Sequence, residues 1–269
     1  MLPQEALIAR VRQVCAEDQR LDAALMYGSF AAGEGDTFSD IEFLLYFADD
    51  LQPSVDQDAW LREIAPVALS LVNEAGIRVA IFDETLIRGE FHFDRAADIA
   101  RIDAGWREYD WLPSYETALV LDRTGALTDR LRSVVGPPLT RRTPDRVASV
   151  SHNFVNWLLF GATVLARGEH ARAHELLGHV GRHLLWLARL AEGIDAHWPT
   201  PSRALETDLS ADAYARYAAC TAPLDPAAIA AAYRAAWDWG KELMAALSPD
   251  DPPVPKSLIA ALDRRILVP

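Results

Sequence analysis

The stretch that decides the fold reads Gly28-Ser29-Phe30-Ala31-Ala32-Gly33-Glu34-Gly35-Asp36-Thr37-Phe38-Ser39-Asp40-Ile41-Glu42-Phe43. Gly28-Ser29 interrupts a short apolar run at its end, and Asp40 to Glu42 opens a second run that continues to Phe47. Both runs have the composition of buried strands. Because successive strand side chains point to opposite faces, Asp40 and Glu42 share one face, about 6.7 Å apart along the strand.

Two carboxylates at the head of a buried strand are costly unless a positive charge neutralises them. Hard oxygen ligands in a small site favour Mg²⁺, so we predict that Asp40 and Glu42 bind this metal. Gly28 lets the backbone approach a ligand closely, and the Ser29 hydroxyl at a helix start can bind phosphate oxygens. Taken singly, Asp40 is more readily a cap, Glu42 a solvated strand residue and Gly28-Ser29 a turn. The combination at this spacing predicts nucleotidyl transfer, with metal ions bridging the triphosphate.

The rest of the first half alternates β-rich runs with helical segments. Helical patterns cover residues 4–16 and 58–72. Strands are expected at residues 23–27, 41–47, 77–82, 88–93 and 118–121. Strands that alternate with helices in this way predict a mixed sheet with helices packed on it.

Beyond Pro138 the pattern is helical almost throughout. Helices are expected at residues 143–167, 169–192, 210–220 and 225–247, with a short one after Pro255. We therefore expect an α+β protein with a mixed-sheet domain over residues 1–138 and an α-helical bundle domain over residues 139–269.

The composition narrows the class of protein. Lys and Arg number 26 and Asp and Glu 39, which gives a net charge of −13, so binding to nucleic acid is not expected. Cys15 and Cys220 stand far apart, which excludes a disulfide scaffold and a zinc ribbon. The start of the chain lacks a signal-peptide pattern, and the most apolar run, residues 154–166, is shorter than the roughly 20 residues of a membrane span. We expect a cytoplasmic protein with no membrane partner.

The glycine, serine and carboxylate motif resembles the nucleotidyltransferase superfamily that includes DNA polymerase β and the antibiotic nucleotidyltransferases. Residues 26–30, 33–36 and 38–43 resemble in particular the lincosamide nucleotidyltransferases of the larger, two-domain type. The segment Leu86-Ile87-Arg88-Gly89-Glu90-Phe91-His92-Phe93 resembles the same branch and is more specific to it. The helical half matches through Asn153, Asn156-Trp157 and Arg167-Gly168-Glu169. The resemblance covers most of the chain and is weakest after Ser248.

The resemblance implies a polymerase-β-like nucleotidyltransferase domain followed by a helical bundle. It implies Mg²⁺-dependent transfer of AMP from ATP, or of a nucleotide from GTP, to a hydroxyl of lincomycin or clindamycin, which inactivates the antibiotic. Asp40 and Glu42 then bind the metal and Glu90 is the general base. The resemblance also implies a homodimer. An aminoglycoside acceptor and a non-catalytic, antitoxin-like module are the alternatives; the intact Gly28, Ser29 and carboxylates argue against the second.

The residues around Glu90 leave several roles open. Period 2 places Arg88, Glu90 and His92 on one face of their strand. Asp83, at the end of the preceding strand, competes with Glu90 as the third carboxylate. Arg88 either steadies the triphosphate or pairs with Glu90. His92 either contacts the substrate or is a hydrogen-bonded structural histidine.

The helical half contributes three candidate substrate contacts. The segment 146–165 is apolar on nearly every side, so Asn153 and Asn156 are expected to be buried amides that bind other helices or the substrate. Glu169 either caps its own helix or contacts a cationic amine of the substrate.

Overall fold

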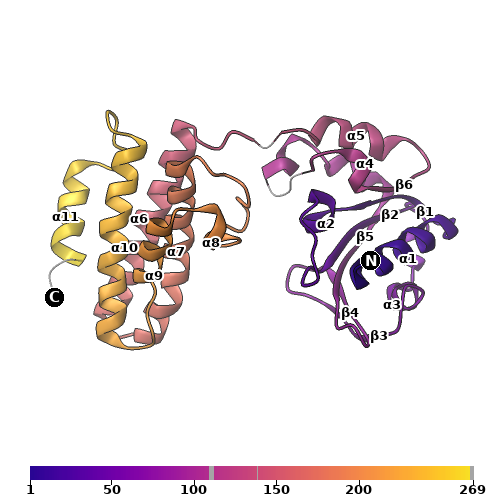
Figure 1. Cartoon of the computed structure of the whole chain (residues 1–269), viewed down its shortest axis with the longest axis horizontal. Helices are drawn as coiled ribbons and strands as arrows, with labels where there is room; N and C mark the ends of the chain where they lie inside the picture. Colours follow the sequence, from indigo (N-terminus) through magenta and orange to yellow (C-terminus); the bar gives the residue numbers. More distant parts are fainter. Residues whose placement is uncertain (109–111, 138, 267–269) are drawn as a thin grey trace. The chain divides into compact units, whose positions relative to one another are not determined.

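A computed structural model describes residues 1–108, 112–137 and 139–266 (Figure 1). The chain divides into two compact units, residues 1–139 and 140–269, and each has its own hydrophobic core. Among the helices of the described residues, none is long and apolar enough to cross a membrane.

The first unit is built on a mixed sheet. Over the described residues the sheet has six strands in the order β3-β4-β5-β2-β1-β6. The strands are β1 (Leu21–Met26), β2 (Ile41–Phe47), β3 (Val67–Val72), β4 (Arg78–Phe82), β5 (Arg88–Arg95) and β6 (Leu119–Asp122). The central strands β2 and β5 run parallel, whereas the other neighbouring pairs are antiparallel. With the helical second unit, this confirms the predicted α+β fold class.

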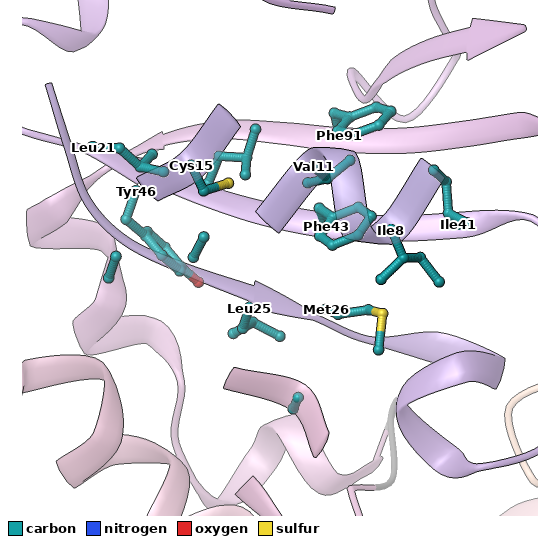
Figure 2. Close-up of a cluster of buried hydrophobic side chains, with 14 of the residues drawn as sticks. Ile8, Val11, Cys15, Leu21, Leu25, Met26, Ile41, Phe43, Tyr46 and Phe91 are labelled. Atoms are coloured by element: carbon teal, nitrogen blue, oxygen red, sulfur yellow. The ribbon is translucent and has the colours of Figure 1, made fainter. Parts of the chain in front are cut away.

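Helices flank this sheet. They are α1 (Pro3–Glu17), α2 (Gly28–Ala32), α3 (Gln57–Arg62), α4 (Tyr115–Ala118) and α5 (Ala126–Val134), with 3₁₀ turns η1 (Gln52–Ser54), η2 (Ala96–Arg101) and η3 (Ala104–Glu108). The apolar side of α1, predicted from its helical period, faces the sheet: Figure 2 shows Ile8, Val11 and Cys15 pointing toward strand residues that include Phe43. Burial of these side chains holds α1 on the sheet.

The helix expected at residues 58–72 is wrong. The helix α3 ends at Arg62, and residues 67–72 form the edge strand β3. Pro66 explains the break, because proline has no N–H and disfavours helical backbone at the residue before it. A tight turn then returns the chain to β4, with the Asn73 N–H donating to the Ile77 carbonyl at 2.9 Å.

The helix α5 was not predicted from the sequence. Its start depends on Asp122 at the end of β6, whose carboxylate accepts the backbone N–H groups of Gly125 at 2.8 Å and of Thr128 at 2.8 Å. Burial opposes the charge of Asp122, but these hydrogen bonds outweigh it and lower the pKa of the carboxyl.

The second unit is a helical bundle. Its helices are α6 (Pro144–Ala166), α7 (His170–Glu192), α8 (Leu205–Asp208), α9 (Ala211–Ala219), α10 (Pro226–Leu247) and α11 (Lys256–Ile266). The N-caps of α6 and α10 follow the sequence signals: Thr143 and Asp225 accept backbone N–H groups, and each precedes a proline at the first helical position. Gly193, in the left-handed conformation, ends α7.

A buried arginine ties the segment after α7 to that helix. The side chain of Arg189 is fully buried and donates to the carbonyls of Pro201 at 2.9 Å, Ala196 at 2.7 Å and Arg203 at 2.6 Å. It also binds Asp208 at 2.9 Å, and His197 binds the same carboxylate oxygen at 2.8 Å. Burial opposes the charge of Asp208, but the bonds from His197 and Arg189 outweigh it and lower its pKa.

Candidate active site

Three carboxylates gather at the start of the two central strands. Asp40 directly precedes β2, Glu42 is the second residue of β2, and Glu90 lies on β5. The parallel register pairs Glu42 with Glu90. Burial alternates along β5, so Arg88, Glu90 and His92 share the less buried face, as period 2 predicts. The register therefore brings two segments that are distant in the sequence into one cluster.

Arg88 joins two of these carboxylates. Its Nη1 lies 2.7 Å from Oδ2 of Asp40, and its Nη2 binds Oε1 of Glu90. Burial disfavours the charge of Arg88, but Glu90 and Asp40 outweigh that cost and raise the pKa of the guanidinium. The guanidinium thus supplies positive charge to a cluster that would otherwise be strongly negative.

Tyr27 also enters this cluster, and the sequence patterns assigned it no role. Its hydroxyl donates to Oε2 of Glu90 at 3.4 Å and lies 3.0 Å from Nε2 of His92. Two signals in the sequence pointed to it: its place in the segment 26–30 that carries the resemblance, and its position directly before Gly28-Ser29, where a side chain leaving the first strand reaches the same sheet edge. His92 is therefore hydrogen-bonded within the cluster.

Gly28 and Ser29 form the first residues of α2. Gly28 has φ of +70°, and a Cβ built on it would lie 1.5 Å from Oε2 of Glu42. The absence of a side chain at residue 28 is therefore what lets the Glu42 carboxylate lie against the backbone. Ser29 is only 7% exposed, and its Oγ has no hydrogen-bond partner in the part of the chain that the structure describes. A buried hydroxyl without a partner suits a ligand oxygen.

Replacing Gly28 by alanine is expected to disable the site, because the new methyl group collides with Glu42 and the backbone is strained. A displacement of about 1 Å at a reacting group costs about 100-fold in rate. Gly33→Ala is the matched control, since Gly33 has φ of +80° but no atom within 4 Å of the place that a methyl group would take. Turnover and thermal melting of both variants check this; equal losses of turnover in the two would contradict it.

The donor set fits a divalent metal shared with a substrate. Among the described residues, no group of three or more His, Cys, Asp and Glu side chains could hold a metal by itself. Asp40 and Glu42 offer hard carboxylate oxygens, and Mg²⁺ is commonly bound by one or two carboxylates together with water and substrate phosphates. The arrangement thus suits a metal that arrives with a phosphate ligand.

Asp83, the competing third carboxylate, lies elsewhere. It is exposed in the turn between β4 and β5, and its Oδ1 accepts the backbone N–H of Glu84 at 2.9 Å. The hydrogen bonds of Arg88 go instead to Asp40 and Glu90. The geometry favours Glu90 over Asp83.

The expectation that Asn153 and Asn156 are buried is wrong, because α6 leaves one face uncovered. Both amides are exposed, and Asn153 donates to the Ser149 carbonyl at 2.9 Å. Trp157 and Phe160 share this face, and the Trp157 ring stacks on His179 of α7 with centroids 4.2 Å apart. We call these five residues the α6–α7 face.

Glu169 lies at the edge of the same two helices. It is the N-cap residue of α7, but its side chain makes no capping hydrogen bond. Its carboxylate instead pairs with Arg172 at 3.2 Å, and the Arg172 guanidinium lies 5.3 Å from the centre of the Phe160 ring. The structure thus places Glu169 at the surface, in an ion pair next to the α6–α7 face.

Comparison with protein families agrees with the resemblance. Residues 143–264 match the family described as "Lincosamide nucleotidyltransferase-like, C-terminal domain". Among solved structures, an aminoglycoside 6-adenyltransferase from Bacillus subtilis is 12% identical with a TM-score of 0.44, over 99% of this chain and 98% of that one. A nucleotidyltransferase-like protein from Exiguobacterium sibiricum 255-15 is 16% identical with a TM-score of 0.38, over 91% of this chain and 77% of that one. A search of curated proteins finds no match. Residues 143–264 are thus similar to the C-terminal domain of lincosamide nucleotidyltransferase-like proteins, which supports a nucleotidyltransferase.

Proposed function

We propose that this protein transfers AMP from ATP to a hydroxyl of a lincosamide antibiotic in a reaction that requires Mg²⁺. The observation that carries the proposal is the cluster of Asp40, Glu42 and Glu90 beside the Gly28-Ser29 turn, in a chain whose residues 143–264 match a lincosamide nucleotidyltransferase-like domain. GTP is the alternative donor. We also propose that the enzyme acts in the cytoplasm and is a homodimer.

The donor nucleotide is held by groups around Gly28. The unpartnered Ser29 hydroxyl and the open backbone at Gly28 contact the triphosphate, and Arg88 contacts it with N–H groups that do not bind Glu90. Asp40 and Glu42 would hold Mg²⁺, which supplies charge neutralisation for the triphosphate and the departing pyrophosphate. An arginine suits this position because its planar fork can bind either a carboxylate or a phosphate.

Glu90 acts as the general base. Its carboxylate takes the proton from the acceptor hydroxyl while the hydroxyl oxygen forms a bond to the α-phosphorus. The bond between the α-phosphorus and the bridging oxygen breaks on the opposite side, and its electron pair leaves with pyrophosphate. The products are the adenylylated acceptor, pyrophosphate and a protonated Glu90, which then returns its proton to solvent.

We assign three side chains of the second unit to binding of the acceptor: Asn153, Asn156 and Glu169. Trp157, stacked on His179, offers a flat apolar surface beside the two amides, a combination that suits the face of a sugar ring and its hydroxyls. A net charge of −13 favours an acceptor that carries a cationic amine.

A mass-spectrometric assay tests the proposal. The protein is incubated with ATP and Mg²⁺ and with clindamycin, lincomycin or kanamycin in separate reactions, with GTP and EDTA arms beside them. An adenylyl mass on the lincosamides alone supports the proposal. The same mass on kanamycin alone keeps the chemistry and replaces the acceptor class by an aminoglycoside. No product with any acceptor and either nucleotide favours the non-catalytic, antitoxin-like module.

Glu90→Gln is expected to lower kcat by about 10²- to 10³-fold, because glutamine keeps the size of the side chain but cannot accept the proton. Binding of the nucleotide and the metal is expected to remain, since Asp40 and Glu42 are unchanged. Asp83→Asn is the matched control and should keep near-normal turnover. If Asp83→Asn lost activity while Glu90→Gln kept it, the base would be Asp83.

A further inference from the structure

Tyr27 connects the two strands that carry the carboxylates. Its backbone N–H donates to the Glu42 carbonyl on β2 at 3.1 Å, whereas its hydroxyl reaches Glu90 and His92 on β5. Its ring meets the His92 ring edge-on, with centroids 5.8 Å apart and an interplanar angle of 68°. Tyr27 thus binds the strand of the proposed metal ligands through its backbone and the strand of the proposed base through its hydroxyl.

The two oxygens of Glu90 have different donors. Oε1 is bound by Arg88, and Oε2 accepts the Tyr27 hydroxyl at 3.4 Å. Arg88 alone would leave the carboxylate free to rotate about its last torsion, since that torsion is broad. A second donor on the other oxygen defines the plane of the carboxylate.

The single proton of the Tyr27 hydroxyl determines which group donates in the hydrogen bonds that link His92, Tyr27 and Glu90. A phenol has one proton, so Tyr27 donates either to Glu90 or to His92. If it donated to His92, the phenol oxygen and the ionised Glu90 Oε2 would face each other with no proton between them. The favoured arrangement is therefore His92 Nε2–H donating to Tyr27 and the Tyr27 hydroxyl donating to Glu90.

We propose that Tyr27 is a positioning residue for Glu90: its hydroxyl, itself oriented by His92, holds the plane of the carboxylate that receives the acceptor proton. This rests on the proposed function, because it takes Glu90 as the base. Tyr27 acts through Glu90 and does not contact the reacting atoms. Hydrogen bonds from a supporting side chain orient a catalytic group in this way when its own torsions are soft.

Tyr27→Phe removes the hydroxyl and keeps the ring. We expect kcat to fall by about 10-fold, less than the loss caused by a full 1 Å displacement of the base. The KM values for nucleotide and acceptor should stay near those of the wild type, because a fall in kcat alone marks an interaction made in the transition state. Tyr115→Phe is the control: this tyrosine lies on α4, where Arg132 stands over its ring at 5.8 Å, and should change neither constant.

A second readout needs no turnover. Nitrogen NMR of the His92 side chain in nucleotide-free protein reports which ring nitrogen carries the proton, and the wild type should show Nε2–H. In Glu90→Gln the amide oxygen should face Arg88, which can only donate, so the amide NH₂ should face Tyr27. The hydrogen bonds then reverse their direction, and Tyr27 donates to Nε2 of His92. Because Nε2 then accepts, the proton of the His92 ring should lie on Nδ1. Tyr115→Phe should leave the ring unchanged.

The outcomes separate the two proposals. A change of the His92 tautomer in Glu90→Gln, with a selective loss of kcat in Tyr27→Phe, supports the role of Tyr27. The same tautomer in wild type and Glu90→Gln, or an unchanged kcat in a folded Tyr27→Phe, overturns it. A wild-type protein without product in any reaction would overturn the proposed function, and the tautomer would still decide whether the chain from His92 to Glu90 exists.

Discussion

Asp40→Asn is expected to reduce nucleotidyl transfer by about 10⁴-fold or more. Metal-assisted charge stabilisation contributes several kcal/mol to a transition state, and each 1.36 kcal/mol is about a factor of ten in rate. Asparagine keeps the shape of the side chain, and its oxygen can still accept Nη1 of Arg88, which lies 2.7 Å from Asp40 in the wild type. The fold should therefore survive while the metal ligand is lost.

Two measurements check this expectation. Product is quantified by mass spectrometry, and binding of Mn²⁺ in the presence of a non-hydrolysable ATP analogue is followed by electron paramagnetic resonance. Asp58→Asn is the matched control, since Asp58 is also a carboxylate in an arginine pair, 3.5 Å from Arg78. Wild-type turnover in Asp40→Asn would mean that the metal is held elsewhere; lost turnover with intact Mn²⁺ binding would give Asp40 another role.

Arg189→Met is expected to lower the free energy of unfolding of the helical unit by about 3–5 kcal/mol. Methionine fills a similar volume but donates no hydrogen bond. The carbonyls of Ala196, Pro201 and Arg203 would lose their donor, and Asp208 would lose its ion-pair partner. Each buried group left unsatisfied adds a desolvation cost.

Urea denaturation followed by far-ultraviolet circular dichroism measures this loss. Arg182→Met, at an exposed position of the same helix, is the matched control and should change the free energy of unfolding by less than about 0.5 kcal/mol. Arg189→Lys should fall between the two, since its ammonium has fewer donors than a guanidinium. A loss in Arg189→Met as small as that of the control would show that water replaces these bonds.

Much of the fold follows from local patterns. Five of the strands were predicted because their apolar runs are short and bounded by turn residues, and the long helices because Thr143-Pro144, Gly193 and Asp225-Pro226 mark their ends. The prediction failed at residues 58–72, where an apolar run that satisfies a helical period also satisfies a strand once Pro66 interrupts it. The predicted burial of Asn153 is also wrong, because periodicity does not indicate which side of an apolar helix is covered by its neighbours.

Spacing within single segments predicts the members of the candidate site: the pair Asp40 and Glu42, the turn at Gly28-Ser29, and the shared face of Arg88, Glu90 and His92. How these segments meet depends on the folded chain. The parallel register of β2 and β5 sets Glu42 beside Glu90, and it brings Arg88 within reach of Asp40. The contacts of Tyr27 and Arg189 join segments that no local period relates, because hydrogen bonds between distant residues depend on register and burial, which arise only when the whole chain packs.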